Sequence, residues 1–164
     1  MEKILIINTG GTFNKIYNPI SGELEIDSSG KAIESIAKSW LIDFKVINII
    51  GKDSLDMIDS DREEIYRTII ESGFQKIIIV HGTDTIDKTA KYLDELNLDK
   101  QIILTGAMVP FSINPIEATA NLSSAYGYLV ILKENRVYIA MNGKKDLYKR
   151  DIKNRGKGYF EITL

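Results

Sequence analysis

The sequence predicts a three-layer α/β/α domain with a mainly parallel, doubly wound sheet. Short runs rich in Ile and Val recur along the chain and are nearly continuous in apolar character, as in strands that are covered on both faces. Helical patterns lie between these runs and the connections are short, which is typical of strands and helices alternating in a parallel sheet. The chain has 164 residues with no linker, repeat or low-complexity tract, so we expect one domain over residues 1–164.

Five apolar runs are the predicted strands, and they cover residues 3–7, 44–50, 76–80, 101–104 and 136–141. Three helices are expected, over residues 59–73, 83–96 and 114–132. In the first helix Ser60 and Glu63 have the spacing of a capping box, and Gly73 is the expected C-cap. The third helix is expected to start at Pro115, because proline is favoured in the first turn.

The composition excludes several classes of function. A net charge of -2 and a pI near 5.5 provide no basic surface for nucleic acid. The chain has no cysteine and a single histidine, His81, which excludes disulfides, thiolate nucleophiles and metal clusters built on histidine or cysteine. The N-terminal apolar run breaks at Asn8, which is too early for a signal peptide or a membrane span. We therefore expect a cytoplasmic protein that binds neither nucleic acid nor membranes.

The residues directly after each strand are the first candidates for a site, because ligands bind parallel sheets beyond the carboxyl ends of the strands. Three such exits carry a threonine beside a glycine: "TGGT" at 9–12, "HGTDT" at 81–85 and "TGAM" at 105–108. A tight turn requires glycine, but it does not require threonine each time. The repeated threonines favour a site over three independent turns.

Each of these motifs also has a purely structural interpretation. The glycines at 10 and 11 can form only a tight turn, and their spacing matches neither a P-loop nor G-x-G-x-x-G. Asp84 can be a helix N-cap or first-turn acid, or it can orient a nucleophile and hold a substrate ammonium group. His81 is a structural hydrogen-bonding residue in one interpretation and a general base in the other.

Two further segments are candidates. Residues 13–24 are long, polar and marked by glycine and proline, which predicts a mobile flap over a site, with Tyr17 in its middle as a docking aromatic. Five basic residues near the end form a charge run that predicts a solvated face, although one buried member could lower the pKa of a neighbouring hydroxyl; they are Lys149, Arg150, Lys153, Arg155 and Lys157.

Taken together, "TGGT", "YNPISGEL", "HGTDT" and "TGAMVPFS" resemble the bacterial-type L-asparaginase family in wording, order and position at strand ends. The resemblance covers residues 4–155 and corresponds to the N-terminal domain of the usual two-domain enzyme. It implies a Rossmann-like or flavodoxin-like sheet. It also implies that the C-terminal domain, which completes the amino-acid pocket of a neighbouring subunit in the two-domain enzymes, is absent from this chain.

The resemblance implies a catalytic set. Thr12 looks like the nucleophilic threonine that forms an acyl-enzyme, and Tyr17 matches the flap tyrosine that helps to activate it. Thr83, Asp84 and Lys153 look like the family's threonine, aspartate and lysine set, with Asp84 also a partner for the substrate ammonium group. The family pattern places the lysine at the position of Asn154, so the assignment of Lys153 assumes a gap in the preceding loop.

The resemblance also implies substrate contacts. Ser54 aligns with the serine that binds the substrate α-carboxylate, and the backbone around Gly11 and Ala107 is expected to form an oxyanion or ligand cradle. The residue after Ser54 is often glutamine or asparagine in the family, but here it is Leu55. Leucine cannot make the same polar contact to an amino acid.

Two functions follow from this resemblance. The first is an asparaginase-like amidohydrolase that releases ammonia from L-asparagine or a related small amide, without metal or organic cofactor, in a homo-oligomer of two or four subunits. The second is a catalytically weak or inactive binding or regulatory module that retains the pocket for aspartate-like ligands. Leu55 and the missing domain favour the second function, whereas the survival of Thr12, Tyr17, Thr83 and Asp84 favours the first.

Overall fold

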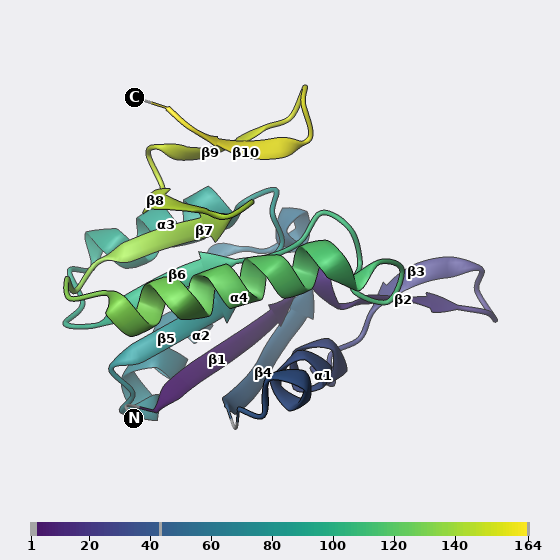
Figure 1. Cartoon of the computed structure of the whole chain (residues 1–164), viewed down its shortest axis with the longest axis horizontal. Coiled ribbons are helices and arrows are strands. Elements are labelled where there is room, and N and C mark those ends of the chain that lie inside the picture. The colour runs from purple at the N-terminus through teal and green to yellow at the C-terminus, as the bar shows by residue number, and fades with distance from the viewer. Residues whose placement is uncertain (1–2, 43, 164) are drawn as a thin grey trace.

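The computed structural model describes residues 3–42 and 44–163, and a six-stranded sheet forms its centre (Figure 1). The strand order is β4-β1-β5-β6-β7-β8. The first five of these strands run parallel, and β8 is antiparallel to β7. Their bounds are β1 (Ile4–Gly10), β4 (Lys45–Lys52), β5 (Lys76–Val80), β6 (Gln101–Thr105), β7 (Val137–Met141) and β8 (Lys144–Leu147). The prediction of a mainly parallel sheet is confirmed.

Helices cover both faces of the sheet. In Figure 1, α1 (Lys31–Trp40) and α4 (Pro115–Ile131) lie in front of it, and α2 (Asp59–Ser72) and α3 (Ile86–Glu95) lie behind it. Alternate residues of β1 enter two separate cores: Leu5 and Ile7 pack with α2 and α3, whereas Ile4 and Ile6 pack with α1 and α4. A strand that is buried on both sides reads as a continuous apolar run, which explains the pattern in the sequence. Within the described ranges, no helix is long and apolar enough to cross a membrane.

The helix boundaries correct one prediction about capping. Helix α2 starts at Asp59, and the carboxylate of Asp61 accepts a hydrogen bond of 2.8 Å from the backbone N–H of Ile58. The predicted capping box of Ser60 and Glu63 is therefore wrong, because this start places Asp61 three positions after the N-cap. The predicted C-cap at Gly73 is confirmed, with a left-handed φ of 69°.

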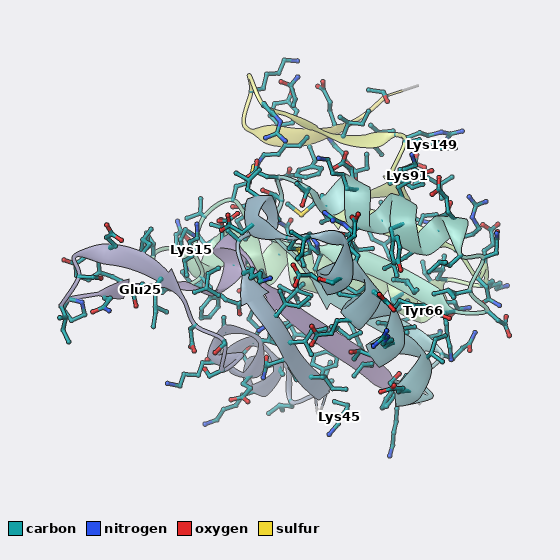
Figure 2. All side chains as sticks on the ribbon, turned by 180° about the vertical axis from the view of Figure 1, so that it is seen from behind. Lys15, Glu25, Lys45, Tyr66, Lys91 and Lys149 are labelled. Carbon is teal, nitrogen blue, oxygen red and sulfur yellow. The ribbon has the colours of Figure 1, made fainter. Side chains whose placement is uncertain are left out.

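Residues 13–24 form no irregular loop. After the short 3₁₀ helix η1 (Thr12–Asn14), β2 (Lys15–Asn18) and β3 (Glu23–Ile26) pair as an antiparallel hairpin. The hairpin projects from the body of the domain, with Lys15 at its base and Glu25 further out (Figures 1 and 2). The turn closes by a hydrogen bond of 2.8 Å from the N–H of Gly22 to the carbonyl of Asn18. The flap of the sequence prediction is thus a β-hairpin.

A second hairpin follows β8 and was not predicted. It consists of β9 (Asp151–Asn154) and β10 (Tyr159–Ile162), and it lies at the top of Figure 1. One side packs inward, because Asp151 is 0% and Phe160 is 1% exposed. Most of the basic run lies on this hairpin and the turn before it. Two members of the run, Lys153 and Arg155, contact the rest of the domain rather than solvent alone.

The sheet topology brings the strand exits together. Asn8 of β1 is level with Val80 of β5, and Val80 is level with Thr105 of β6. Strand β1 continues through its polar residues to Gly10, beyond the predicted end at residue 7. The chain passes from β1 to β4 on one side and then to β5 on the other side, so the strand order reverses at β1. Sites in doubly wound sheets lie at such a reversal.

Candidate active site

Two of the strand-end threonines are occupied in holding the sheet together. The hydroxyl of Thr9 donates to the carbonyl of Val80 at 2.9 Å, and the hydroxyl of Thr105 donates to the carbonyl of Ala140 at 2.8 Å. Both threonines are at most 1% exposed. Each one bridges its strand to a neighbouring strand, and neither presents a hydroxyl to a ligand.

Thr12 is placed differently. It is half-buried, it begins η1, and its hydroxyl makes no hydrogen bond to any residue in 3–42 or 44–163. Gly11 precedes it with a φ of 71°, and a Cβ atom on Gly11 would lie 2.6 Å from the Cα of Gly82. Only glycine fits such an approach and such a φ. The glycine therefore seats Thr12 directly beside the exit of β5, with a hydroxyl that is available to a ligand.

Two buried asparagines fix the turn before Thr12. The side-chain amide of Asn14 donates to Asn8 Oδ1 at 2.8 Å and to the carbonyl of Gly10 at 2.7 Å. Asn8 and Asn14 are 2% and 3% exposed, so these bonds form away from competing water. The sequence prediction missed both residues as part of the site. The available signal was a polar residue, Asn8, inside an otherwise apolar strand.

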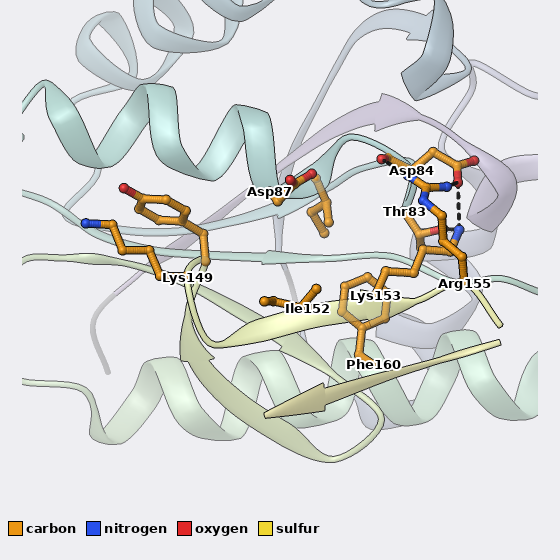
Figure 3. Close-up of a pocket in the computed structure, with 10 residues that line it drawn as sticks. Thr83, Asp84, Asp87, Lys149, Ile152, Lys153, Arg155 and Phe160 are labelled. Carbon is orange, nitrogen blue, oxygen red and sulfur yellow. Dashed lines mark hydrogen bonds and ion pairs between the residues drawn. The ribbon is translucent and has the colours of Figure 1, made fainter. Parts of the chain in front are cut away.

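The structure brings Thr83, Asp84 and Lys153 together, from the exit of β5 and from β9 (Figure 3). Lys153 Nζ donates to Thr83 Oγ1 at 2.9 Å and to Asp84 Oδ1 at 2.8 Å. The side-chain amide of Asn154 instead donates to Glu161 Oε1 at 2.8 Å. Of the two positions considered for the lysine, the geometry favours Lys153.

Asp84 also binds Arg155, a residue that the sequence prediction left on a solvated face. Arg155 Nη1 donates to Asp84 Oδ1 at 2.7 Å, and Nη2 donates to the backbone carbonyl of Asp84 at 2.9 Å. The hydrogen bond from Lys153, followed by that from Arg155, holds the pKa of Asp84 below its usual value. The N-cap of α3 is Thr85, so the interpretation of Asp84 as a helix cap is wrong.

A cavity of about 320 Å³ lies between the start of α3 and the β9–β10 hairpin. Figure 3 shows Thr83, Asp84 and Arg155 at one end of it and Lys149 at the other end. Thr12 does not line this cavity. The cavity is therefore bordered by the side chains of Lys153 and Arg155 and not by the free hydroxyl of Thr12. In the part of the chain that the structure describes, no three His, Asp or Glu side chains gather to hold a metal ion.

Ser54 lies in the 3₁₀ helix η2 (Ser54–Asp56) and joins the same set of loops. It is 1% exposed; its hydroxyl oxygen accepts from the N–H of Thr85 at 3.3 Å, and its carbonyl accepts from the Thr85 hydroxyl at 2.8 Å. A Cβ atom on Gly82 would lie 2.7 Å from the Cβ of Ser54. The adjacent Leu55 is 68% exposed. The structure thus places Ser54 against the β5 exit and turns Leu55 to solvent.

The remaining predicted residues contribute less. Ala107 is fully buried in the core beside α4, so only its backbone can face a ligand. The N–H of Gly11 donates to the carbonyl of Lys52 at 2.9 Å and is not free for an oxyanion, which removes this donor from the predicted cradle. Tyr17 is 61% exposed on β2, and its hydroxyl has no hydrogen-bond partner among the described residues.

His81 is a structural residue. Its Nδ1 lies 2.7 Å from the carbonyl of Gly82, and its Nε2 lies 2.8 Å from the hydroxyl of Thr89. Because a carbonyl can only accept, Nδ1 carries the hydrogen and Nε2 accepts from Thr89. Complete burial lowers the pKa of His81 to about 4. A neutral ring with both nitrogens engaged is not available as a general base.

The burial of His81 predicts how the free energy of unfolding depends on pH in the acid range. As pH falls from 6.5 to about 4, the unfolded chain takes up a proton at this residue and the folded chain does not. The free energy of unfolding of the wild type should therefore fall by about 3 kcal/mol over this range through His81 alone. In urea denaturation at several pH values, His81→Gln should lose less stability in acid by about that amount. An equal loss in both proteins would contradict the assignment.

Comparison with known families decides which family this site belongs to. The family model described as "Asparaginase, N-terminal" matches residues 3–152. The chain belongs to the asparaginase family. This membership confirms the resemblance inferred from the strand-end motifs.

Curated relatives are similar over most of the chain. It is 28% identical, over 91% of its length, to a probable periplasmic L-asparaginase of Haemophilus influenzae, of which it covers 46%. It is 26% identical, over 96% of its length, to L-asparaginase 1 of Escherichia coli K12, of which it covers 49%. The chain thus spans about half the length of the curated relatives that it matches.

Solved asparaginases have the same fold. The thermostable L-asparaginase from Thermococcus kodakarensis superposes with a TM-score of 0.81 at 26% identity, covering 98% of this chain and 51% of that one. A probable cytoplasmic L-asparaginase from Campylobacter jejuni gives a TM-score of 0.76 at 27% identity, covering 94% of this chain and 50% of that one. The predicted fold class is confirmed. The names of the relatives include both periplasmic and cytoplasmic proteins, so the cytoplasmic location stays a prediction.

Proposed function

We propose that the chain acts as an asparaginase-like amidohydrolase that releases ammonia from the side-chain amide of L-asparagine or a related small amide. The observation that carries the proposal is the contact of Lys153 with both Thr83 and Asp84 at 2.9 and 2.8 Å, beside a turn that offers the free hydroxyl of Thr12. Membership of the asparaginase family supports the same conclusion. The chemistry uses no metal and no organic cofactor.

In the proposed first step the Thr12 oxygen attacks the amide carbon. A C–O bond forms, the C–N bond breaks, and the Thr12 proton is transferred so that the nitrogen leaves as ammonia. Water then hydrolyses the resulting ester and restores the hydroxyl. Negative charge develops on the amide oxygen during both steps and requires hydrogen-bond donors. Because the N–H of Gly11 is bound to Lys52, we assign this role to the backbone N–H groups of Thr12 and Ala107.

We propose that proton transfer to the leaving nitrogen depends on three residues, Thr83, Asp84 and Lys153. Because the Lys153 ammonium donates to Thr83 Oγ1, the hydrogen of the Thr83 hydroxyl points away from Lys153, toward a substrate or water. Asp84 keeps the lysine in this position through the bond to Nζ. A positioned hydroxyl beside a fixed charge can orient the attacking water and pass a proton to the leaving group.

Replacing Lys153 tests this assignment. Lys153→Gln is expected to lower kcat by about 10³-fold, because it removes the charge that orients Thr83. Lys149→Gln is the matched control, since Lys149 lines the opposite end of the same cavity (Figure 3), and it should leave kcat close to that of the wild type. Steady-state ammonia release measures both variants. Equal effects of the two substitutions would point to the general charge of the cavity instead.

The test of the function itself is ammonia release from L-asparagine, L-glutamine and small aliphatic amides, with Thr12→Ala as the blank. Turnover by the wild type above this blank on any of them supports the proposal. If the two proteins give the same rate on every amide, the proposed activity is excluded for those substrates.

A binding or regulatory module is the second candidate function. The exposure of Tyr17, 61%, and of Leu55, 68%, favours it, because two side chains that were expected to complete the site are largely open to solvent. This function predicts that L-aspartate raises the melting temperature by ligand linkage while no ammonia appears.

We also propose self-association into dimers or tetramers, for which exposed Ile113 and Ile116 at the start of α4 provide apolar surface.

A further inference from the structure

We propose that Arg155 sets the selectivity of this site by occupying Asp84, so that the site favours the monoamides of dicarboxylic acids without an α-ammonium group over α-amino acid amides. The inference rests on the proposed function for the location of the site. It concerns a residue outside the catalytic set and a class of ligand that the set alone does not specify.

The contacts of Asp84 are the first argument. Its Oδ1 atom accepts from both Lys153 Nζ at 2.8 Å and Arg155 Nη1 at 2.7 Å, and its backbone carbonyl accepts from Arg155 Nη2 at 2.9 Å. The two ends of the guanidinium group thus hold the side chain and the backbone of one residue. Charge-assisted bonds of this forked kind fix geometry as well as charge. A ligand ammonium group would be a third cation at one carboxylate.

The local charge is the second argument. Asp84, Lys153 and Arg155 together carry a net charge of +1, and Figure 3 shows them side by side. The carboxylate of Asp53 is close enough to feel the charge of Asp84, but Lys15 pairs with it at 2.9 Å and offsets its charge. The group therefore repels an ammonium ion and attracts a carboxylate.

The turn after β9 holds Arg155 in place. Asn154 Oδ1 accepts from the N–H groups of Gly156 and Lys157 at 3.1 and 3.0 Å. These bonds fix the backbone of the turn on either side of Arg155, and they do not depend on the contact between the Arg155 side chain and Asp84. The side chain itself is 63% exposed, so water screens the contact, and we expect a preference between ligands rather than complete exclusion of one class.

The test compares two product-like acids by isothermal titration calorimetry, L-aspartate and succinate, which differ only in the ammonium group. The wild type should bind succinate more tightly than L-aspartate. Arg155→Gln should shift the ratio of the two dissociation constants by about fivefold toward L-aspartate. Lys157→Gln is the matched control, because Lys157 lies on the same turn, is 60% exposed and pairs with Glu161 rather than Asp84; it should leave the ratio unchanged.

An unchanged ratio in Arg155→Gln overturns the proposal, as does a wild type that binds neither acid or prefers L-aspartate. Arg155→Met is measured in parallel, so that a folding defect of one substitution does not decide the result. The proposed function is tested separately by kcat/KM for succinamic acid and L-asparagine. If neither amide is hydrolysed while the binding ratio still shifts, the hydrolase proposal fails and the selectivity proposal stands.

Discussion

The Thr12→Ala variant is expected to release ammonia at least about 10⁴-fold more slowly than the wild type on any amide that the wild type hydrolyses. The physical reason is that the other hydroxyls at the first and third exits are occupied. Thr9 and Thr105 donate to backbone carbonyls at 2.9 and 2.8 Å and are inaccessible. Without the Thr12 hydroxyl no acyl-enzyme can form, so water must attack the amide directly. The remaining groups of the site can then only polarise the amide carbonyl.

The control for this variant is Thr12→Ser, which retains the hydroxyl and should retain most of the activity. Thr83→Ala separates the two threonines of the site. A nucleophile yields an acyl-enzyme that mass spectrometry can detect after rapid acid quenching, so the adduct should disappear in Thr12→Ala and persist, at a lower rate of formation, in Thr83→Ala. An adduct that maps to Thr83 would assign the nucleophile to that residue and contradict the mechanism.

The Asp151→Asn variant is expected to become more stable than the wild type as pH rises. Asp151 is 0% exposed, and neither of its carboxylate oxygens has a hydrogen-bond partner in the described part of the chain. Burial raises its pKa to about 7, against the opposing effect of Lys144 and with the help of Asp146, both on β8. A buried carboxyl without a partner is tolerated only while it is protonated.

The direction follows from the two pKa values. The unfolded chain loses the Asp151 proton near pH 3.8, whereas the folded chain keeps it until about pH 7. Stability contributed by the bound proton is complete below pH 3.8 and is lost as pH rises through 7. The wild type should therefore lose about 4 kcal/mol of unfolding free energy between these values, and Asp151→Asn should not.

Urea denaturation at about pH 5 and pH 8 measures this difference. Asp59→Asn is the control, because its side chain is fully exposed at 104% and its removal should change stability equally at both pH values. If the difference between wild type and Asp151→Asn is the same at both values, Asp151 has a partner that the fold does not show.

The central strands β1, β5, β6 and β7 could be predicted from sequence because they are buried on both faces. Strand β8, whose four residues are all half-buried, was not predicted. Residues 76–80 were predicted with the observed bounds, since every position of β5 after the first is buried. The two hairpins could not be predicted in this way. In β2 and β3, Ile16, Tyr17 and Leu24 are all at least 43% exposed, so no buried face imposes a regular pattern on the sequence.

The gathering of the strand exits was also predictable, because the carboxyl ends of parallel strands meet at one edge of a sheet. Which of the residues at these exits have a structural role, and which are open to a ligand, could not be predicted from the sequence. Thr9 and Thr12 each lie beside a glycine in the sequence, and only the bond of the Thr9 hydroxyl to the carbonyl of Val80, 71 residues away, distinguishes Thr9 as structural. Arg155 lies in a run of basic residues, and its contact with Asp84 depends on how β9 folds back over the β5 exit.

The close stacking of glycines at the site limits where this protein can change. A methyl group at residue 11 would meet Gly82 at 2.6 Å, and one at residue 82 would meet Ser54 at 2.7 Å. The segments that follow β1, β5 and β4 are thus packed directly against one another. A larger side chain at residue 11 or 82 would therefore displace the neighbouring segment. Substitutions that change which ligands the candidate site accepts are therefore expected to be tolerated mainly at the rim, at Leu55, Arg155 and the β2–β3 hairpin.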